Sequence, residues 1–75
     1  MEDDVVVVAH ITGNVWKVHK QVGDQVSEGE TVVILESMKM EIPVEAPAAG
    51  RVSFVHTREG DPVDEGAPLI TIAID

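Results

Sequence analysis

The residues with the clearest chemical potential lie near the middle of the chain, where one lysine stands between two methionines. The segment reads Glu36-Ser37-Met38-Lys39-Met40-Glu41 and separates two apolar runs, residues 31–35 and 42–46. A two-residue turn centred between Met38 and Lys39 predicts a β-hairpin that pairs Leu35 with Ile42 and Val33 with Val44. Both pairs are apolar and share one face, so this strand register is self-consistent.

The predicted turn has an unusual sequence, and this draws attention to Lys39. Two-residue hairpin turns favour Asn-Gly or a similar pair because the backbone takes positive φ values there. Met-Lys is a poor choice for such a turn, and methionines at an exposed tip gain nothing from burial. A local rule that is broken within an otherwise consistent element is where a functional residue is expected.

The Lys39 amine is poorly placed to act as a catalyst by itself. With an ordinary lysine pKa of about 10.4, only about a few in ten thousand such amines are neutral at pH 7. A tight surface turn offers no burial that would lower this pKa. The amine is better suited to be acylated by another enzyme that supplies its own activation.

The other ionisable candidates give weaker indications. Glu36 and Glu41 face each other across the predicted hairpin. This arrangement fits a solvated acidic edge better than an acid–base pair, because an exposed hairpin lacks the burial that separates two pKa values. His10, His19 and His56 show none of the spacings of a metal site, so we expect no bound metal.

Trp16 and Phe54 are the two aromatic residues of the chain. Aromatic side chains bury a large apolar area when they enter a core. We therefore expect both to pack in the core or at an end of the barrel rather than to form a platform for a ligand.

Length and composition limit what the chain can do. Seventy-five residues predict a single domain over 1–75 with a thin core and no room for an active-site cleft, so we expect no enzyme. Fourteen acidic and five basic residues give a net charge of −9, which disfavours nucleic acid and anionic membranes. The charge favours solubility or steering toward basic partners. Without cysteine, signal peptide or membrane helix, we expect a cytoplasmic protein.

The chain matches itself after a shift of 37 positions. The shift aligns turn glycines, histidines and valines: Gly13 with Gly50, Val15 with Val52, His19 with His56, Gly23-Asp24 with Gly60-Asp61, and Glu28-Gly29 with Glu65-Gly66. Each half encodes strand, Gly, strand, Gly-Asp turn, short strand, Glu-Gly turn and strand. Gly23 and Gly60 are expected to need positive φ or close approach.

The predicted fold class is all-β. Strands are expected over 5–9, 14–18, 25–27, 31–36, 41–46, 51–55, 62–64 and 69–74. Two copies of one unit predict a flattened β-barrel or sandwich of two four-stranded antiparallel sheets with pseudo-twofold symmetry. The continuous apolar run Val5 to Val8 predicts a strand that is covered on both faces or crosses between layers.

The repeat also predicts where the ends of the chain lie. A shift of 37 carries Lys39 back to Glu2 or forward to just beyond Asp75. The equivalent of the lysine turn is therefore the place where the termini meet, and the same index sum of 77 pairs Val7 with Ile70 and Val5 with Ile72. Lys39 is expected at one end of the molecule and both termini at the other.

The segment around Lys39 closely resembles the attachment motif of biotinyl domains, the biotin carboxyl carrier family, whose usual form is Ala-Met-Lys-Met after a Glu. Ser37 replaces Ala, a small-for-small change. The similarity extends to Gly23-Asp24-x-Val26-x-Glu28-Gly29, Ala46-Pro47-x-x-Gly50-x-Val52 and Gly60-Asp61-x-Val63. It thus covers nearly the whole chain.

The resemblance implies a fold, a cofactor and partners. The fold would be the flattened barrel of biotinyl/lipoyl carriers, with biotin in amide linkage on Lys39, added by a biotin–protein ligase. Met38 and Met40 would flank the lysine and serve recognition and carboxyl transfer, and Glu36 would help the ligase read the hairpin. The carrier would shuttle a carboxyl group between a biotin carboxylase and a carboxyltransferase, and we expect the isolated chain to be monomeric.

Two alternatives and one departure accompany this resemblance. The connection from Lys17 to Val22 has no room for the "thumb" loop of some bacterial carriers, so the chain resembles a minimal, thumbless domain. A lipoyl domain shares the fold and displays a lysine at the same turn, but its motif usually has Asp before and Ala after the lysine. An unmodified structural barrel is the other alternative.

Overall fold

Eight β-strands make up the secondary structure in a computed structural model that describes residues 3–75. The strands are β1 (Asp4–Val8), β2 (Gly13–Val18), β3 (Gln25–Val26), β4 (Thr31–Ser37), β5 (Met40–Glu45), β6 (Gly50–Val55), β7 (Pro62–Val63) and β8 (Pro68–Ile74). Every predicted strand is present, and each boundary lies within one residue of its predicted position.

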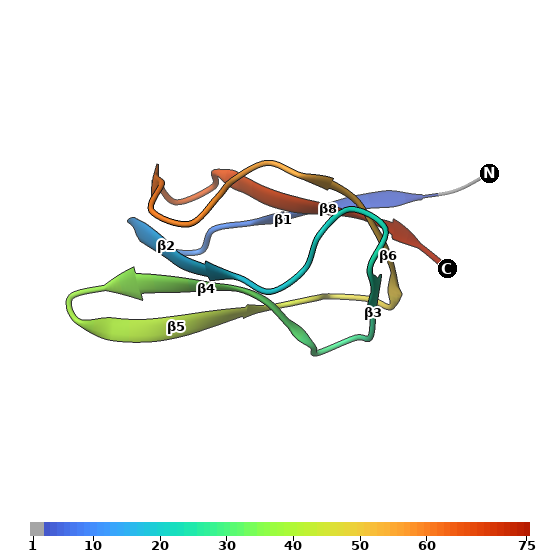
Figure 1. Cartoon of the computed structure of the whole chain (residues 1–75), viewed down its shortest axis with the longest axis horizontal. Helices are drawn as coiled ribbons and strands as arrows, with labels where there is room; N and C mark the ends of the chain where they lie inside the picture. Colours follow the sequence, from blue (N-terminus) through green and yellow to red (C-terminus); the bar gives the residue numbers. More distant parts are fainter. Residues whose placement is uncertain (1–2) are drawn as a thin grey trace.

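The strands form two four-stranded sheets, with strand orders β1-β8-β6-β3 and β5-β4-β2-β7. All pairings are antiparallel. In Figure 1, β1, β6 and β8 form one layer, while β2, β4 and β5 form the other. The predicted class, an all-β sandwich of two four-stranded antiparallel sheets, is confirmed.

The core between the sheets follows the sequence repeat. Its buried side chains are all aliphatic: Val7, Ala9, Val15, Val26, Val32, Val33, Leu35, Val44, Ala46, Val52, Val63, Leu69, Ile70 and Ile72. These residues form seven pairs spaced by 37 positions, such as Val7 with Val44 and Leu35 with Ile72. No polar side chain is buried within residues 3–75. The pseudo-twofold axis is thus built into the core itself.

Backbone hydrogen bonds obey the same symmetry. The Gly23 N–H donates to the Val52 carbonyl and the Gly60 N–H to the Val15 carbonyl, both at 2.8 Å. The two glycines have φ values of 95° and 94°, which L-residues with a Cβ rarely adopt. The prediction of positive φ at Gly23 and Gly60 is confirmed. These turns hold each half of the chain against the strand of the other half.

β1 differs from its prediction. Its run of valines is neither covered on both faces nor shared between the two layers, because β1 is the edge strand of one sheet and pairs only with β8. Val7 is buried, but Val6 on the other face is 48% exposed. Valine suits any pleated surface, so an apolar run of β-branched residues does not by itself distinguish a covered strand from an edge strand.

The prediction that Trp16 and Phe54 pack in the core or at a barrel end is wrong. Trp16 is 40% exposed and Phe54 is 57% exposed. Each lies at or just after a register shift, between Val15 and Lys17 in β2 and between Val52 and Phe54 in β6. Trp16 follows buried Val15 and so faces solvent by the ordinary alternation of a strand. In β6 the bulge breaks this alternation and turns Phe54, two residues after buried Val52, to the solvent side.

The long axis of the molecule separates the lysine turn from the ends of the chain. The Cα extents are 40 × 17 × 17 Å, and the β4–β5 hairpin points to one end of the long axis in Figure 1 while the C-terminus lies at the other. The Ile74 N–H donates to the Asp3 carbonyl at 2.9 Å, so the two ends of the described chain adjoin. Glu2, the predicted equivalent of Lys39, lies outside the described residues.

Candidate attachment site

The hairpin that carries Lys39 has the predicted register. Leu35 pairs with Ile42, Val33 with Val44, and Ser37 with Met40 as the last pair before the turn. The two turn residues are therefore Met38 and Lys39, with φ values of 53° and 64°. Both lie in the left-handed region, as a type I′ turn requires.

This turn is strained because neither of its residues is Gly, Asn or Asp. A residue with a Cβ is about 1–2 kcal/mol less stable in the left-handed conformation than in its favoured regions. Met38 and Lys39 are the non-glycine residues with positive φ within residues 3–75. Strain of this kind gathers at functional sites, where the surrounding structure holds it in place.

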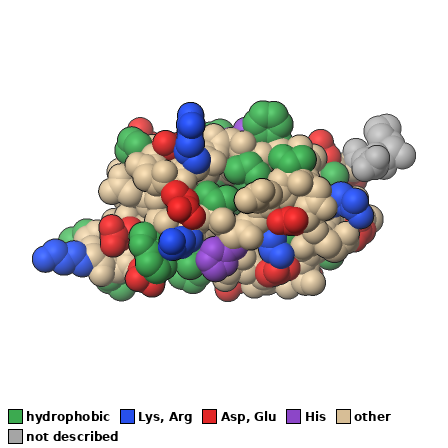
Figure 2. Space-filling view, in the orientation of Figure 1, with side chains coloured by type: hydrophobic (Ala, Val, Ile, Leu, Met, Phe, Trp, Pro, Cys, Tyr) green, Lys and Arg blue, Asp and Glu red, His purple; other side chains and the backbone are tan. Residues whose placement is uncertain are grey.

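The tip of the hairpin is open to solvent. Met38 is 92% exposed and Met40 is 64% exposed, and Lys39 is exposed between them. Within residues 3–75 no hydrogen bond or ion pair holds the Lys39 amine. Figure 2 shows a basic side chain projecting beyond the rest of the surface at the end where the hairpin lies. The amine is thus fully accessible to another protein.

The base of the hairpin, in contrast, is firmly held. Leu35 is completely buried, and Asn14 of β2 pairs with Glu36. At Gly13 a Cβ would lie 2.5 Å from the Glu36 carbonyl oxygen, so only glycine lets β2 approach the hairpin this closely. Gly13 is a supporting residue that the sequence analysis aligned with Gly50 but did not place at the site.

The carboxylates beside the lysine form the predicted exposed pair. Glu36 and Glu41 lie opposite each other in β4 and β5, and both are exposed. Water screens their mutual repulsion. The arrangement supports the interpretation as a solvated acidic edge.

The histidines do not assemble a metal site. No group of three or more His, Cys, Asp or Glu side chains within the described part of the chain could hold a metal ion. His19 and His56 make equivalent backbone bonds, to the Val32 and Leu69 carbonyls at 2.8 Å. Their side chains differ, because His56 Nε2 lies 2.6 Å from Thr71 Oγ1 and the residue equivalent to Thr71 is Ile34.

No helix among residues 3–75 has the length and apolar character to cross a membrane.

The geometry suits covalent attachment of an acyl group. A lysine amine on an exposed turn can form an amide with a carboxylic acid, and nothing in the described structure crowds the group that would extend from it. The strained tip stands on a rigid base, at the opposite end from the chain ends. These features are those of a carrier domain, a small scaffold that presents an exposed lysine at one end.

Comparison with known proteins identifies the family to which the chain belongs. The family model described as "Biotin-requiring enzyme", the biotin/lipoyl domain, matches residues 5–72, and the chain belongs to this family.

The connection between β2 and β3, residues 19–24, is short, in agreement with a domain that lacks a thumb loop.

Individual relatives point in the same direction. A biotin/lipoyl attachment protein of Bacillus subtilis is 58% identical over 40 residues, which are 53% of this chain and 55% of that protein. The matched stretch is thus about half of each. In the crystal structure of Kluyveromyces lactis urea carboxylase, 6% of the chain matches 93% of this one, with 36% identity and a TM-score of 0.87.

In a second solved structure, too, nearly all of this chain matches a small part of a much larger protein. In a single-chain, multi-domain long-chain acyl-CoA carboxylase, 7% of the chain matches 96% of this one, with 30% identity and a TM-score of 0.91. The fold of this chain therefore also occurs as a small part of much larger carboxylases.

Proposed function

We propose that Lys39 carries covalently attached biotin and that the chain is the carboxyl carrier of a biotin-dependent carboxylase. The observation that carries this proposal is the turn itself: an accessible lysine in a strained left-handed conformation between two exposed methionines. Family membership over residues 5–72 and the match to parts of two carboxylases support it.

Attachment needs a separate enzyme. The Lys39 nitrogen attacks the carbonyl carbon of an activated biotinyl group, the activating group leaves, and the amine loses its proton as the amide forms. Because the nitrogen must lose a proton when the amide forms, a biotin–protein ligase would supply both the activated acid and a base. Glu36 and the flanking methionines are the exposed features by which the ligase would recognise the hairpin.

The chain contributes position rather than catalysis. Bound biotin supplies the ureido nitrogen that takes up and releases a carboxyl group. The rigid base of the hairpin holds the lysine at the extreme end of the long axis, so that the arm can enter deep active sites. A tether attached near Asp3 or Asp75 would leave that end clear. The partners that follow are a biotin carboxylase and a carboxyltransferase.

Lipoate is the second candidate, favoured by one observation. The Bacillus subtilis relative is named for both biotin and lipoyl attachment, and an exposed hairpin of this kind presents few contacts that would exclude a second ligase. Intact mass of the protein purified from its own host distinguishes the two adducts. A lipoyl mass without avidin binding would contradict the biotin assignment.

The decisive variant is Lys39→Arg. Arginine keeps the charge at an exposed position, so the melting temperature should stay unchanged, while labelling by biotin–protein ligase and avidin binding should vanish. Lys17→Arg, which changes another exposed lysine, should be labelled like the wild type. Full host function of the Lys39→Arg protein would instead favour an unmodified structural barrel.

A further inference from the structure

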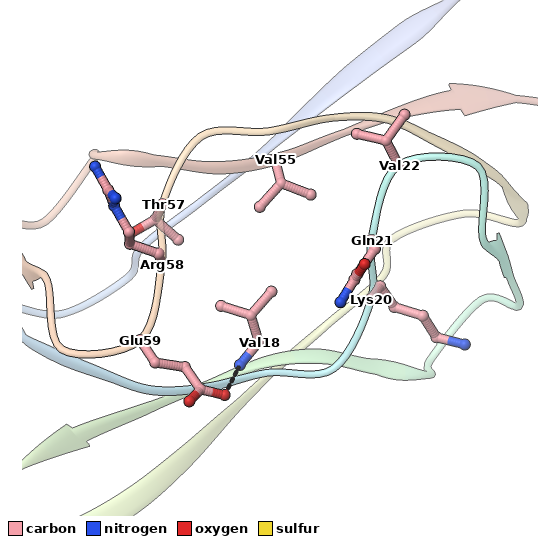
Figure 3. A pocket seen from close by; sticks show the side chains of 8 residues that line it. All are labelled: Val18, Lys20, Gln21, Val22, Val55, Thr57, Arg58 and Glu59. Carbon is pink, nitrogen blue, oxygen red and sulfur yellow. Dashed lines mark hydrogen bonds between the residues drawn. The ribbon is translucent and has the colours of Figure 1, made fainter.

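A hollow of about 480 Å³ opens on the side of the barrel, between the β2–β3 connection (residues 19–24) and the β6–β7 connection (residues 56–61). The eight residues that line it form four pairs spaced by 37 positions, so the hollow straddles the pseudo-twofold axis. We call it the axial pocket. Figure 3 shows Val18 and Val55, one such pair, pointing into it from the two halves.

The axial pocket is symmetric in shape but not in chemistry. Val22 on its wall is 64% exposed, whereas the equivalent residue of the other half is Glu59. Phe54, the neighbour of Val55, is also exposed, and its equivalent is Lys17. The fold therefore accepts a charged residue at both positions, and its packing does not require the exposed apolar side chains. Apolar surface of this kind marks a contact with another molecule.

The charges around the axial pocket also differ from those of the hairpin. In a chain of net charge −9, the pocket is lined by Lys20 and Arg58. Lys20 is engaged with Glu30 at 2.6 Å, and the lining carboxylate Glu59 accepts a hydrogen bond from the Val18 N–H at 3.5 Å. No ion pair within residues 3–75 involves Arg58.

The Arg58 guanidinium is therefore available at the rim. Figure 3 shows its side chain directed away from the centre of the pocket, on the opposite side from Val22 and Gln21. Figure 2 shows hydrophobic side chains gathered along the upper part of this face, with one basic side chain and several acidic ones near them. An apolar group that enters the pocket would thus have a cation beside it.

We propose that the axial pocket docks the biotin carboxylase component, which inserts an apolar side chain next to a carboxylate that pairs with Arg58. This inference rests on the proposed function. A pocket of this volume is in the range that holds a compact apolar group, and the unpaired guanidinium complements a carboxylate. Because the pocket lies on the side of the barrel, docking there leaves the hairpin free to reach an active site.

Such a second contact has a physical purpose. A carrier must leave each active site quickly, so binding through the hairpin alone has to be weak. A separate contact raises the effective concentration of the arm near its target without tightening the hold on the arm itself. We expect this docking to act on the affinity of the carrier for the component and not on the rate of the chemical step.

Pseudo-symmetry supplies variants that the fold should tolerate. Val22→Glu, Phe54→Lys and Arg58→Gln each install the residue that occupies the equivalent position in the other half. Two matched controls lie outside the residues that line the pocket. Ala49→Glu repeats the charge change of the first variant at an exposed position, and Arg51→Asn removes another exposed cation.

The experiment uses the biotinylated full chain and the biotin carboxylase component of the same host. Initial carboxylation rates are measured over a range of carrier concentrations. The KM for the carrier should rise about fivefold or more in Val22→Glu and Arg58→Gln, as for loss of an interface hot spot, with kcat unchanged. The two control variants, the ligase rate and every melting temperature should match the wild type.

A second measurement does not depend on turnover. Adding the carboxylase component to the ¹⁵N-labelled, unbiotinylated chain should shift or broaden the amide signals of Val22, Val55 and Arg58. These changes should disappear in Val22→Glu and persist in Ala49→Glu.

Several results would overturn the proposal. Equal KM values in the wild type and the pocket variants, with no change in the amide signals, would show that no docking occurs. An equal loss of ligase rate would show that the effect is not specific to the carboxylase. A wild-type dimer that Val22→Glu abolishes would assign the pocket to a second copy of the chain. If the wild-type carrier is not carboxylated at all, the proposed function fails, and docking fails with it.

Discussion

At the scale of single residues, the central fact is that Met38 and Lys39 both adopt positive φ. Neither residue favours this conformation, and glycine or asparagine would be more stable in it. The chain therefore gives up stability at the turn in exchange for two exposed apolar groups beside an amine. This loss of stability is understandable only if another protein binds these side chains and recognises them.

Met38→Asn should raise stability and lower function. Asparagine tolerates the left-handed region, so the free energy of unfolding should rise by about 0.5 kcal/mol, the usual gain from matching a residue to its backbone conformation. Labelling by the ligase or carboxyl transfer should slow, because one methionine of the motif is lost. Urea denaturation and a timed avidin assay measure the two effects.

Met38→Leu is the matched control at the same position. It conserves volume and apolar character, so its stability should equal that of the wild type. A large drop in its melting temperature would contradict the description of Met38 as an exposed residue without a packing role.

At the scale of elements, two glycines set how closely the strands approach. A Cβ at Gly13 would meet the Glu36 carbonyl oxygen, and a Cβ at Gly50 would meet the Ala73 carbonyl oxygen and the Ile72 side chain. Gly23 and Gly60 have a different role, because a Cβ there has open space around it and only the positive φ is demanding. The same residue type thus serves two physical purposes within each half.

These two purposes respond differently to substitution. Gly13→Ala and Gly50→Ala should destabilise the fold by about 1–3 kcal/mol through overpacking. Gly23→Ala should cost about 1 kcal/mol through its backbone conformation. Asparagine should be better tolerated than alanine at Gly23 because it enters the left-handed region more readily. At Gly13 it should be worse, because it is larger.

Chemical denaturation of the five variants measures these differences. If asparagine and alanine ranked in the same order at Gly13 and at Gly23, the two glycines would not differ in why they are required. The distinction between a glycine needed for close approach and one needed for positive φ would then be wrong.

At the scale of the whole molecule, the two halves are locked together by paired turns, and one of these carries an ion pair. Lys20 of the β2–β3 connection contacts Glu30, which follows β3, at 2.6 Å. The Lys20 ammonium, together with the Ser27 N–H, holds the pKa of the Glu30 carboxyl below its usual range. The folded chain thus favours the ionised form of Glu30.

Glu30→Gln should therefore change how stability depends on pH. Because folding lowers the pKa of Glu30, its contribution is present above the pKa of the unfolded group, about 4.3, and is lost as pH falls through the folded value. Glutamine keeps an oxygen for the Ser27 N–H but loses the charge. Wild type should be modestly more stable than Glu30→Gln at pH 7, and the difference should be smaller at about pH 4 and shrink further as the pH falls through the folded pKa.

Urea midpoints at the two pH values measure this difference. Glu59→Gln removes the same charge and serves as a control, because no ion pair within residues 3–75 involves Glu59. A constant gap between wild type and Glu30→Gln at both pH values would show that the ion pair does not cause it.

The sequence by itself determined the strands, their register and the place of the lysine. The 37-residue repeat and the period of two in the apolar residues constrain the same hairpin, so Leu35 opposite Ile42 and Val7 opposite Ile70 could be deduced without coordinates. The symmetry then required Lys39 to lie opposite the chain ends. Local patterns sufficed because each pairing is fixed by which side chains must face the core.

Tertiary structure alone decided which apolar residues face solvent and at which glycines a Cβ would clash with a neighbouring strand. The bulge in β6 places Phe54 outside, and the edge position of β1 exposes Val6. The contact of Gly13 with the hairpin and the axial pocket both arise between segments far apart in sequence. No periodicity encodes such contacts, because they depend on how two sheets and two connections meet in space.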